Sequence, residues 1–339
     1  MIDFRSDTVT LPCKDMRRLM SNAMVGDDVY GDDPTVNELE QYSSVKHGFE
    51  ASLFVSSGTQ ANLLAILAHC ERGDEYICGQ NAHNYKYEAG GAAVLGSVQP
   101  QPIENLPDGR ICLDKVAAAI KPNDFHFART KMLSLENTIG GKVLDLGYLK
   151  EARACTKKYA LKLHLDGARV YNAAIALGVD VKEISQYFDS MTVCLSKGLG
   201  APVGSLLMGD REFIEKARRL RKMLGGGMRQ AGILAAAGIY ALKNNVDRLA
   251  EDHDNARYLA QRLNELPGFD SSSYDVQTNL VFLNVDESID MQAFSEVMFS
   301  KGINLRAGYQ GMRLVTHLGI NKDKIDVFIE TAKSYFNID

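Results

Sequence analysis

One lysine stands directly after an apolar run near the middle of the chain. Residues 191–195 predict a short buried strand, and Ser196-Lys197-Gly198 follows it. Lysine is rarely buried without a partner, so Lys197 is either a surface charge at the end of a strand or a reactive amine. The carboxyl ends of strands in open α/β sheets form ligand sites. A lysine that has lost its water there gives up its proton readily and can form a Schiff base.

A second stretch has the composition of an anion site. Residues 51–55 predict a strand that runs into Ser57-Gly58-Thr59 and then into an apolar helix. The free N–H groups and the positive dipole end of a helix N-terminus bind phosphate. An ordinary helix cap by Ser57 or Thr59 explains the same residues. The stretch by itself leaves both interpretations open.

A third strand end carries a carboxylate. Leucine alternates with polar residues over 161–165, and Asp166 comes next. Alone, Asp166 would be interpreted as a helix cap and Lys197 as a surface residue. Together with Gly58 and Thr59, however, they form the set of groups that holds pyridoxal 5′-phosphate. The lysine binds its aldehyde, the carboxylate keeps its ring nitrogen protonated, and the helix N-terminus takes its phosphate.

The elements that must position these residues alternate between strands and helices. Strands are expected at residues 51–55, 75–78, 92–96, 132–137, 161–165 and 191–195. Alternation of this kind predicts an α/β fold, with a large domain whose mostly parallel sheet is flanked by helices.

The composition changes after Pro267-Gly268, where a smaller C-terminal α/β domain is expected. Its strands are predicted at residues 280–285 and 312–317, and its helices at 291–301 and 322–336. The Gly- and Asp-rich N-terminal residues predict an ordered loop that wraps another surface. The chain is therefore divided into an N-terminal arm or loop (1–35), a large cofactor-binding domain (36–245), and a helical linker with the small domain (246–339).

The composition excludes several classes of protein. The chain of 339 residues has a net charge of −5 and no basic stretch with interleaved aromatic residues, which argues against a nucleic-acid partner. No apolar run approaches the ~20 residues that span a membrane, and no signal peptide is visible. The six cysteines form no C-x-x-C pair, which indicates reduced thiols in a cytoplasmic protein. No metal-ligand spacing is present either.

Long continuous strings then point to a family. The sequence resembles the low-specificity L-threonine aldolases, which have the aspartate-aminotransferase-like fold (fold type I) of pyridoxal-phosphate enzymes and a sheet of the seven-stranded type. The matching strings are R-S-D-T-V-T (5–10), V-G-D-D-V-Y-G-D-D-P (25–34), S-G-T-Q-A-N (57–62), A-H-N-Y (82–85), H-L-D-G-A-R (164–169), C-L-S-K-G-L-G-A-P-V-G-S (194–205), G-G-G-M-R-Q (225–230) and R-L-V-T-H-L (313–318). The resemblance therefore covers nearly the whole chain.

The resemblance implies a set of residues that bind the cofactor. These are Gly58, Thr59, His83, Asp166, Arg169, Ser196 and Lys197, together with Lys222 and Arg229, which would reach the site of a neighbouring subunit. Lys197 would form the Schiff base, Asp166 would pair with the ring nitrogen, and His83 would stack on the ring. Arg169 would lie beside the phenolic oxygen of the cofactor. Read from the residues alone, Lys222 and Arg229 could equally be plain surface charges.

The resemblance also implies substrate-binding residues, namely Ser6, His83, His126, Arg169 and Arg313. Ser6 and Arg313 would bind the substrate carboxylate, for which arginine offers a two-pronged fork. His83 and His126 are the candidate bases, since imidazole titrates near ~6.5. His126 stands between two phenylalanines and could instead be a packed core histidine.

The implied reaction is cleavage of L-threonine, L-allo-threonine and related β-hydroxy-α-amino acids to glycine and an aldehyde, with Lys197, His83 and His126 as catalytic residues. The implied assembly is a homotetramer, a dimer of dimers with its sites at subunit interfaces. The family commonly has a His-Asn pair after Glu136-Asn137-Thr138, where this chain has Ile139-Gly140. The alternatives are another enzyme of the same fold, such as a β-eliminating lyase or a transaminase, and a non-catalytic scaffold.

Overall fold

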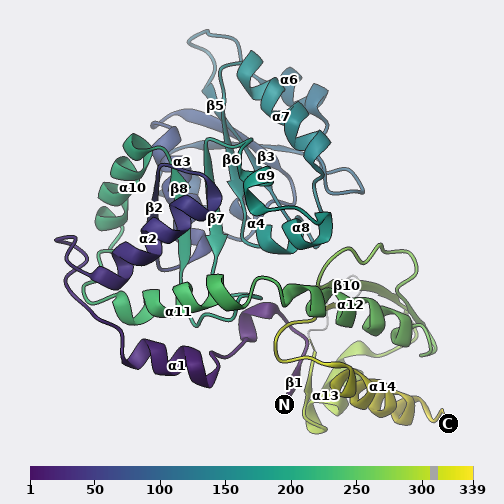
Figure 1. Ribbon diagram of the computed structural model, residues 1–339. Helices are drawn as coiled ribbons and strands as arrows, with labels where there is room; N and C mark the ends of the chain where they lie inside the picture. The colour runs from purple at the N-terminus through teal and green to yellow at the C-terminus, as the bar shows by residue number, and fades with distance from the viewer. Residues whose placement is uncertain (306–311, 339) are drawn as a thin grey trace.

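The computed structural model describes residues 1–305 and 312–338 and contains one large and one small region (Figure 1). The large region is built on a seven-stranded sheet in the order β2-β8-β7-β6-β5-β3-β4. Its strands are β2 (Ala51–Val55), β3 (Asp74–Gly79), β4 (Gln99–Ile103), β5 (Arg129–Glu136), β6 (Lys162–Asp166), β7 (Ser190–Cys194) and β8 (Ser205–Gly209). Only β8 runs antiparallel to its neighbours, so the expected mostly parallel sheet is confirmed.

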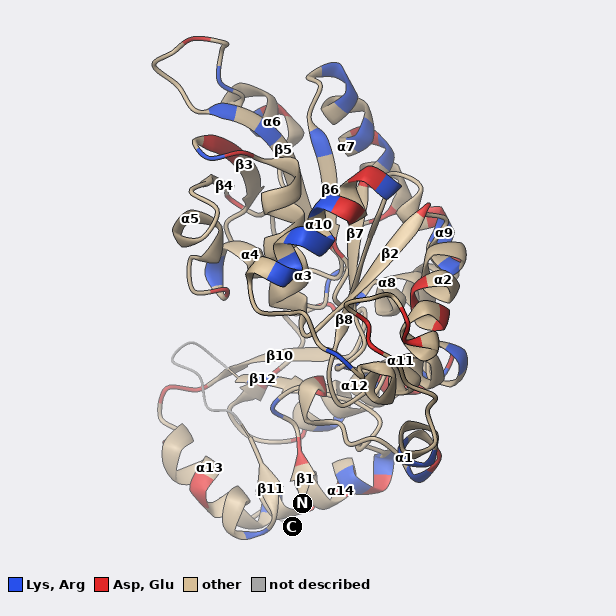
Figure 2. Cartoon of the chain, turned by 90° about the vertical axis from the view of Figure 1, so that its left-hand side faces the viewer, with Lys and Arg blue, Asp and Glu red and all other residues tan. Residues whose placement is uncertain are grey.

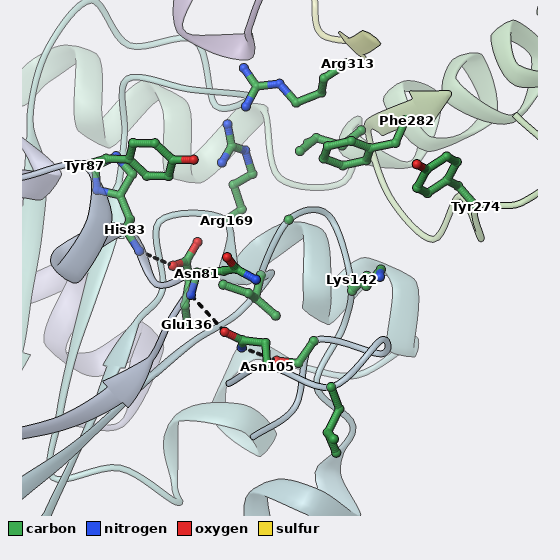
Figure 3. Close-up of a pocket in the computed structure, with 15 residues that line it drawn as sticks. Asn81, His83, Tyr87, Asn105, Glu136, Lys142, Arg169, Tyr274, Phe282 and Arg313 are labelled. Atoms are coloured by element: carbon green, nitrogen blue, oxygen red, sulfur yellow. Dashed lines mark hydrogen bonds between the residues drawn. The ribbon is translucent and has the colours of Figure 1, made fainter. Parts of the chain in front are cut away.

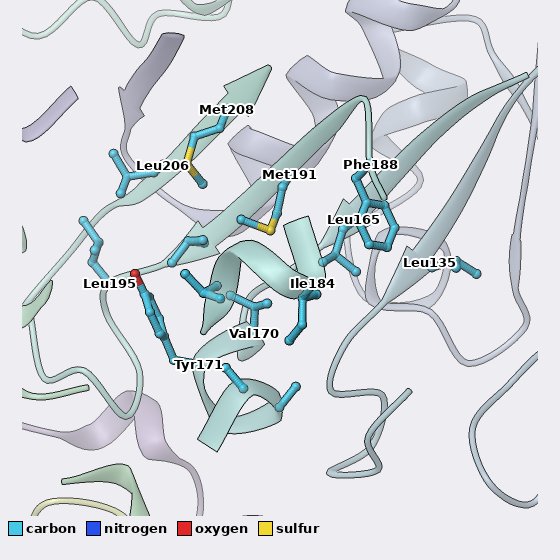
Figure 4. Close-up of a cluster of buried hydrophobic side chains, with 14 of the residues drawn as sticks. Leu135, Leu165, Val170, Tyr171, Ile184, Phe188, Met191, Leu195, Leu206 and Met208 are labelled. Atoms are coloured by element: carbon cyan, nitrogen blue, oxygen red, sulfur yellow. The ribbon is translucent and has the colours of Figure 1, made fainter. Parts of the chain in front are cut away.

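Helices cover this sheet. They are α2 (Pro34–His47), α3 (Gly58–His69), α4 (His83–Lys86), α5 (Gly91–Val94), α6 (Leu113–Ala119), α7 (Leu146–Lys158), α8 (Val170–Leu177), α9 (Val181–Ser185), α10 (Arg211–Met223) and α11 (Gly232–Asn244). Side chains of β6, β7 and β8, such as Leu165, Met191 and Met208, pack against Val170 and Ile184 of α8 and α9 (Figure 4). This buried layer fixes the strand ends that carry the site.

The prediction of a strand at residues 92–96 is wrong. Those residues lie in and after α5, which begins behind Gly90 in the left-handed region at φ 67°. A short apolar run cannot be assigned to a strand or a helix by periodicity alone. The outer strand is instead β4, whose Pro100 and Pro102 suit a strand at the edge of a sheet, where no second neighbour needs their missing N–H groups.

The small region holds α12 (Leu249–Leu263), β9 (Phe269–Asp270), β10 (Leu280–Val285), α13 (Met291–Ser300), β11 (Ile303–Asn304), β12 (Met312–Val315) and α14 (Lys322–Phe336). β12, β10 and β9 form an antiparallel sheet of their own. A separate hydrophobic cluster, which includes Phe294, Phe328 and Ile329, lies behind it. The expected smaller α/β part at the C-terminal end is therefore present.

The N-terminal residues are more ordered than the expected loop. β1 (Ile2–Asp3) pairs in parallel with β11 of the small region, and a short 3-10 helix (Asp7–Val9) follows. α1 (Lys14–Ser21) then packs on α11. The sequence hides this helix because its apolar positions are few and its partner lies more than 200 residues away. Among the helices of the described chain, none has the length and apolar character needed to cross a membrane.

Candidate active site

The three strand ends singled out in the sequence meet at the carboxyl edge of the large sheet. β6 ends at Asp166 and pairs with β7, which leads to Lys197. The first turn of α3 lies directly on the end of β7, because a Cβ placed on Gly58 would come within 2.7 Å of the Sγ of Cys194. Only glycine permits this approach. The fold therefore brings together the amine, the carboxylate and the helix N-terminus.

Asp166 is buried and held by several donors. Its Oδ2 accepts from Asn62 Nδ2 at 2.7 Å, and its Oδ1 accepts from the Ala168 N–H at 3.1 Å. Thr192 Oγ1 lies 3.5 Å from the same oxygen. A buried carboxylate fixed in this way keeps one orientation and stays ready to pair with a cationic group.

Lys197 is half-buried, three residues beyond the end of β7, and Ser196 is half-buried beside it. Thr10 Oγ1 donates to the Lys197 carbonyl at 3.0 Å, so the N-terminal segment fixes the lysine backbone. The ammonium group interacts electrostatically with Asp7, His83 and Glu136. The lysine thus faces a set of groups drawn from three other parts of the chain.

The N-terminus of α3 has backbone N–H groups that are not used within the described residues. Ser57 is its cap, and the Ser57 Oγ accepts from the Gln60 N–H at 3.1 Å. The N–H groups of Gly58 and Thr59 have no acceptor in residues 1–305 and 312–338. Ser57 can therefore cap the helix while the same helix N-terminus binds an anion. An amine, a fixed carboxylate and two spare N–H groups at a helix N-terminus fit the aldehyde, ring nitrogen and phosphate of pyridoxal phosphate.

A cavity of about 380 Å³ opens between the large region and the small sheet (Figure 3). His83, Glu136 and Arg169 line it from the large region, and Phe282 and Arg313 line it from the small one. The side chains of Arg169 and Arg313 point into the same space. A cavity with two guanidinium groups in its lining suits a small anionic ligand.

Arg169 is held by a residue that the sequence reasoning missed. Its Nε and Nη2 donate to the two oxygens of Asp7 at 2.7 and 2.6 Å. Burial opposes ionisation of Asp7, but the Arg169 guanidinium outweighs it and holds the pKa of that carboxyl at about 2. Asp7 lies in the R-S-D-T-V-T string, next to Ser6, yet its partner cannot be inferred from the local sequence.

Glu136, the last residue of β5, also lines the cavity. Its Oε2 accepts from the backbone N–H of His83 at 2.7 Å. Burial, together with the nearby Asp166 carboxylate, raises the pKa of Glu136 to about 8. The strand-end argument that identified Asp166 applies equally to Glu136 and would have found it. Ile139 and Gly140, which replace the family's usual His-Asn pair, line the same cavity.

His83 lies at the start of α4 and is paired with a buried carboxylate. Its Nδ1 lies 2.8 Å from the Oε1 of Glu88. This hydrogen bond raises the pKa of the His83 imidazole above its usual value, against the effect of burial. Nucleophile, carboxylate, cation and imidazole are thus gathered at one edge of the sheet.

Nine candidate residues are not among those that line this cavity. Five of them belong to the strand ends and helix N-terminus described above, namely Gly58, Thr59, Asp166, Ser196 and Lys197. The other four lie elsewhere. Ser6 caps the 3-10 helix, where its Oγ accepts from the Thr8 N–H at 3.2 Å, and it lies next to Asp7. His126 is exposed and bonded to Asp124 at 2.7 Å. Lys222 lines a separate surface hollow along α10, and Arg229 pairs with Asp27 at 2.8 Å.

One group of side chains has the spacing of a metal site. Ligand atoms of His83, Glu88 and Asp166 all lie within 4.8 Å of one another. Asn62 Nδ2 already donates to both carboxylates, at 2.9 and 2.7 Å. These oxygens therefore serve as hydrogen-bond acceptors in the arrangement seen here.

The fold and the site together define a fold type I pyridoxal-phosphate enzyme. The sequence model of the beta-eliminating lyase family matches residues 3–286, and the chain belongs to that family, whose members depend on pyridoxal phosphate. The chain is therefore a pyridoxal-phosphate-dependent lyase.

Individual relatives narrow the comparison. The chain is 59% identical to the low specificity L-threonine aldolase of Escherichia coli strain K12 over 96% of both chains. It is 47% identical to the probable low-specificity L-threonine aldolase 2 of Arabidopsis thaliana, over 84% of this chain and 82% of that one. The fold is also that of the Leishmania major threonine aldolase structure, with a TM-score of 0.84 at 21% identity over 99% of both chains.

Proposed function

We propose that this chain cleaves L-threonine and L-allo-threonine, and related β-hydroxy-α-amino acids, to glycine and an aldehyde. The observation that carries the proposal is the meeting of Lys197, Asp166 and the N-terminus of α3 beside a cavity with two arginines. The high identity to low specificity L-threonine aldolases supports the choice of substrate.

The cofactor, when bound, supplies a pyridine ring that accepts the electrons of a broken Cα bond. Lys197 is proposed to hold its aldehyde as a Schiff base, and Asp166 to hold the proton on its ring nitrogen. The N–H groups of Gly58 and Thr59 are proposed to bind its phosphate. Burial of Asp166 and its hydrogen bonds from Asn62 and Ala168 support this assignment, because they keep the carboxylate in one place.

Arg313 is proposed to bind the substrate carboxylate and thereby to choose which Cα bond breaks. The Nε and Nη2 atoms of Arg169 both donate to Asp7, so Arg169 acts as a fixed cation beside the cofactor. Arg313 comes from the small sheet, and its Nη2 donates to the Arg5 carbonyl at 3.1 Å. The N-terminal segment that carries Ser6 thus supports the arginine that orients the substrate.

His83 is proposed as the base that takes the proton of the substrate β-hydroxyl. It lines the cavity beside Arg169, whereas His126 lies on an exposed loop of the described chain. A base must come within hydrogen-bond reach of the proton it removes. His126 is therefore not proposed as the base within this chain.

The proposed assembly is a homotetramer, in which Lys222 and Arg229 approach a neighbour's site. Both side chains are exposed, and Figure 2 shows that Lys and Arg residues gather along α10. The N-terminal loop exposes large apolar side chains such as Tyr30, as a subunit contact would require. All six cysteines are free, which supports the proposal of a cytoplasmic protein.

The test is product analysis on the holoprotein. We expect each of the two substrates, L-threonine and L-allo-threonine, to give glycine and acetaldehyde in equimolar amounts. Release of a keto acid would instead favour a β-eliminating lyase or a transaminase. Lys197→Ala should abolish both the cofactor's visible absorbance and the activity. Lys243→Ala, a change at an exposed lysine on α11, is the matched control. Activity that survives Lys197→Ala would remove the basis of the proposal.

A further inference from the structure

Glu88 stands at the centre of a buried hydrogen-bonded bridge that none of the proposed steps uses. Its side chain is only 4% exposed. Its Oε1 lies 2.8 Å from His83 Nδ1 and 2.9 Å from Asn62 Nδ2. One carboxylate oxygen therefore lies within hydrogen-bond distance of two nitrogen atoms. The orientation of the Asn62 amide determines which atoms donate and which accept.

The orientation of the Asn62 amide is fixed by its other contacts. Its Oδ1 accepts from Thr192 Oγ1 at 3.3 Å and faces His164 Nε2 at 3.5 Å. Its Nδ2 must therefore point the other way, where it donates to Asp166 Oδ2 as well as to Glu88 Oε1. An amide nitrogen has two protons to give, and both are used here.

The bridge determines where the proton of His83 sits. A carboxylate oxygen only accepts, so the His83 Nδ1 beside it must carry the hydrogen. The other ring nitrogen, Nε2, then keeps its lone pair. Among residues 1–305 and 312–338, no hydrogen bond reaches Nε2. Nε2 is therefore available to take a proton from a ligand in the cavity that His83 lines.

We propose that Glu88 is a positioning residue for the aldol cleavage: anchored by Asn62, it holds His83 in the Nδ1–H form and presents Nε2 as the base. This inference rests on the proposed function, because it assigns a supporting residue to the proposed base. It also links the base to Asp166, since the same Asn62 amide holds both carboxylates.

The charges around His83 are consistent with this arrangement. Three charged groups act on its ring: Glu88, Asp166 and Lys197. Burial raises the pKa of Glu88, while the bonds from His83 and Asn62 act in the opposite direction. The bond to Glu88 raises the pKa of His83.

The decisive variant is Glu88→Met, which keeps the length of the side chain. Glutamine would not serve, because its carbonyl oxygen could still accept from both Asn62 Nδ2 and His83 Nδ1. Methionine offers no such acceptor, so the hydrogen is no longer held on Nδ1 and the imidazole returns to the Nε2–H form that a free histidine side chain prefers. We expect the kcat for L-threonine to fall at least about 100-fold, the lower range for loss of a general base. Glu71→Met, at a carboxylate that is 75% exposed, is the matched control and should leave kcat unchanged.

The readout that does not depend on activity is solid-state ¹⁵N NMR of the holoprotein labelled at histidine, with His83 assigned by its loss in His83→Phe. We expect the hydrogen on Nδ1 in the unmutated protein and on Nε2 in Glu88→Met. In the His83→Phe background, Glu88→Met should cost less than about threefold in kcat, because positioning residues act through their partner.

A hydrogen on Nε2 in the unmutated protein would overturn the proposal, even if Glu88→Met does not fold. An unchanged tautomer in a folded Glu88→Met protein with near-normal kcat would overturn it too. The NMR measurement of the His83 tautomer does not require the protein to turn over substrate. A protein that fails to cleave threonine but carries the Nδ1–H form would refute the proposed function and leave the Glu88 contact confirmed.

Discussion

Asp7 is the anion on which the position of Arg169 depends. The carboxylate is fully buried, and the Arg169 side chain is 15% exposed. Asp7→Asn would leave the guanidinium buried without its counter-ion, which costs about 3 kcal/mol of unfolding free energy. We also expect weaker cofactor binding, because Arg169 loses its fixed orientation. Urea unfolding at pH 7 and cofactor titration by absorbance measure the two effects.

The sign of the pH dependence follows from the depressed pKa of Asp7. The stabilisation is complete above the unfolded value near 3.8 and is lost as the pH falls toward about 2. Asp15→Asn, at an exposed carboxylate on α1, is the control and should change little. Equal stability of Asp7→Asn and the unmutated protein at pH 7 would mean that the pair contributes nothing to the fold.

At the scale of single residues, some functional residues could be predicted from the sequence and others could not, for a physical reason. Lys197 and Asp166 were predictable because each follows an apolar strand, where a charge is out of place unless it has a partner. Asp7 was not, since its partner Arg169 lies 162 residues further along the chain. Glu88 was not either, because only the folded chain sets it between Asn62 and His83.

At the scale of elements, His47 joins three helices. It ends α2, where its Nδ1 lies 2.7 Å from the Ser43 carbonyl, and its Nε2 lies 2.8 Å from the Tyr171 hydroxyl on α8. Ser185 of α9 donates to the His47 carbonyl at 2.6 Å. The neutral ring satisfies both contacts, because Nδ1 donates and Nε2 accepts. Burial accordingly lowers the pKa of His47 to about 4.

This arrangement predicts a pH-dependent contribution to stability. A histidine with a lowered folded pKa stabilises fully above the unfolded value near 6.5, and the contribution is lost as the pH falls toward 4. Between pH 7 and pH 5 the loss amounts to about 2 kcal/mol. His47→Gln should therefore be less stable than the unmutated protein at pH 7, and the gap should narrow by about that amount at pH 5.

Chemical denaturation at both pH values measures the gap, and Gln186→Ala provides a control at the exposed end of α9. A gap that stays constant would show that His47 does not titrate during unfolding. Neither His47 nor the helix contacts around it could be inferred from sequence, since an isolated histidine at a helix end is more often exposed. The boundaries of α2 itself carry local sequence signals, because Asp33-Pro34 starts the helix and Gly48 ends it.

At the scale of the whole molecule, the first seven residues connect the two regions. Phe4 is fully buried in the core of the small region, where its ring lies 5.2 Å from that of Phe328. Its N–H donates to the Asn304 carbonyl at 2.9 Å, and its carbonyl accepts from the Val315 N–H at 2.9 Å. Three residues later, Asp7 binds Arg169 of the large region. No sequence pattern predicts a link between residues about 300 positions apart.

This connection should couple the stability of the small region to substrate binding. Phe4→Ala removes a buried ring and should destabilise the protein by about 3–5 kcal/mol. It also loosens the segment whose Arg5 carbonyl accepts from Arg313, so the KM for L-threonine should rise several-fold while cofactor affinity changes little. Val327→Ala, at a half-exposed position on α14, separates this effect from a general loss of apolar surface. If Phe4→Ala lowers stability but leaves KM unchanged, the N-terminal segment holds the small region together without positioning Arg313, and the carboxylate must be oriented from the large region alone.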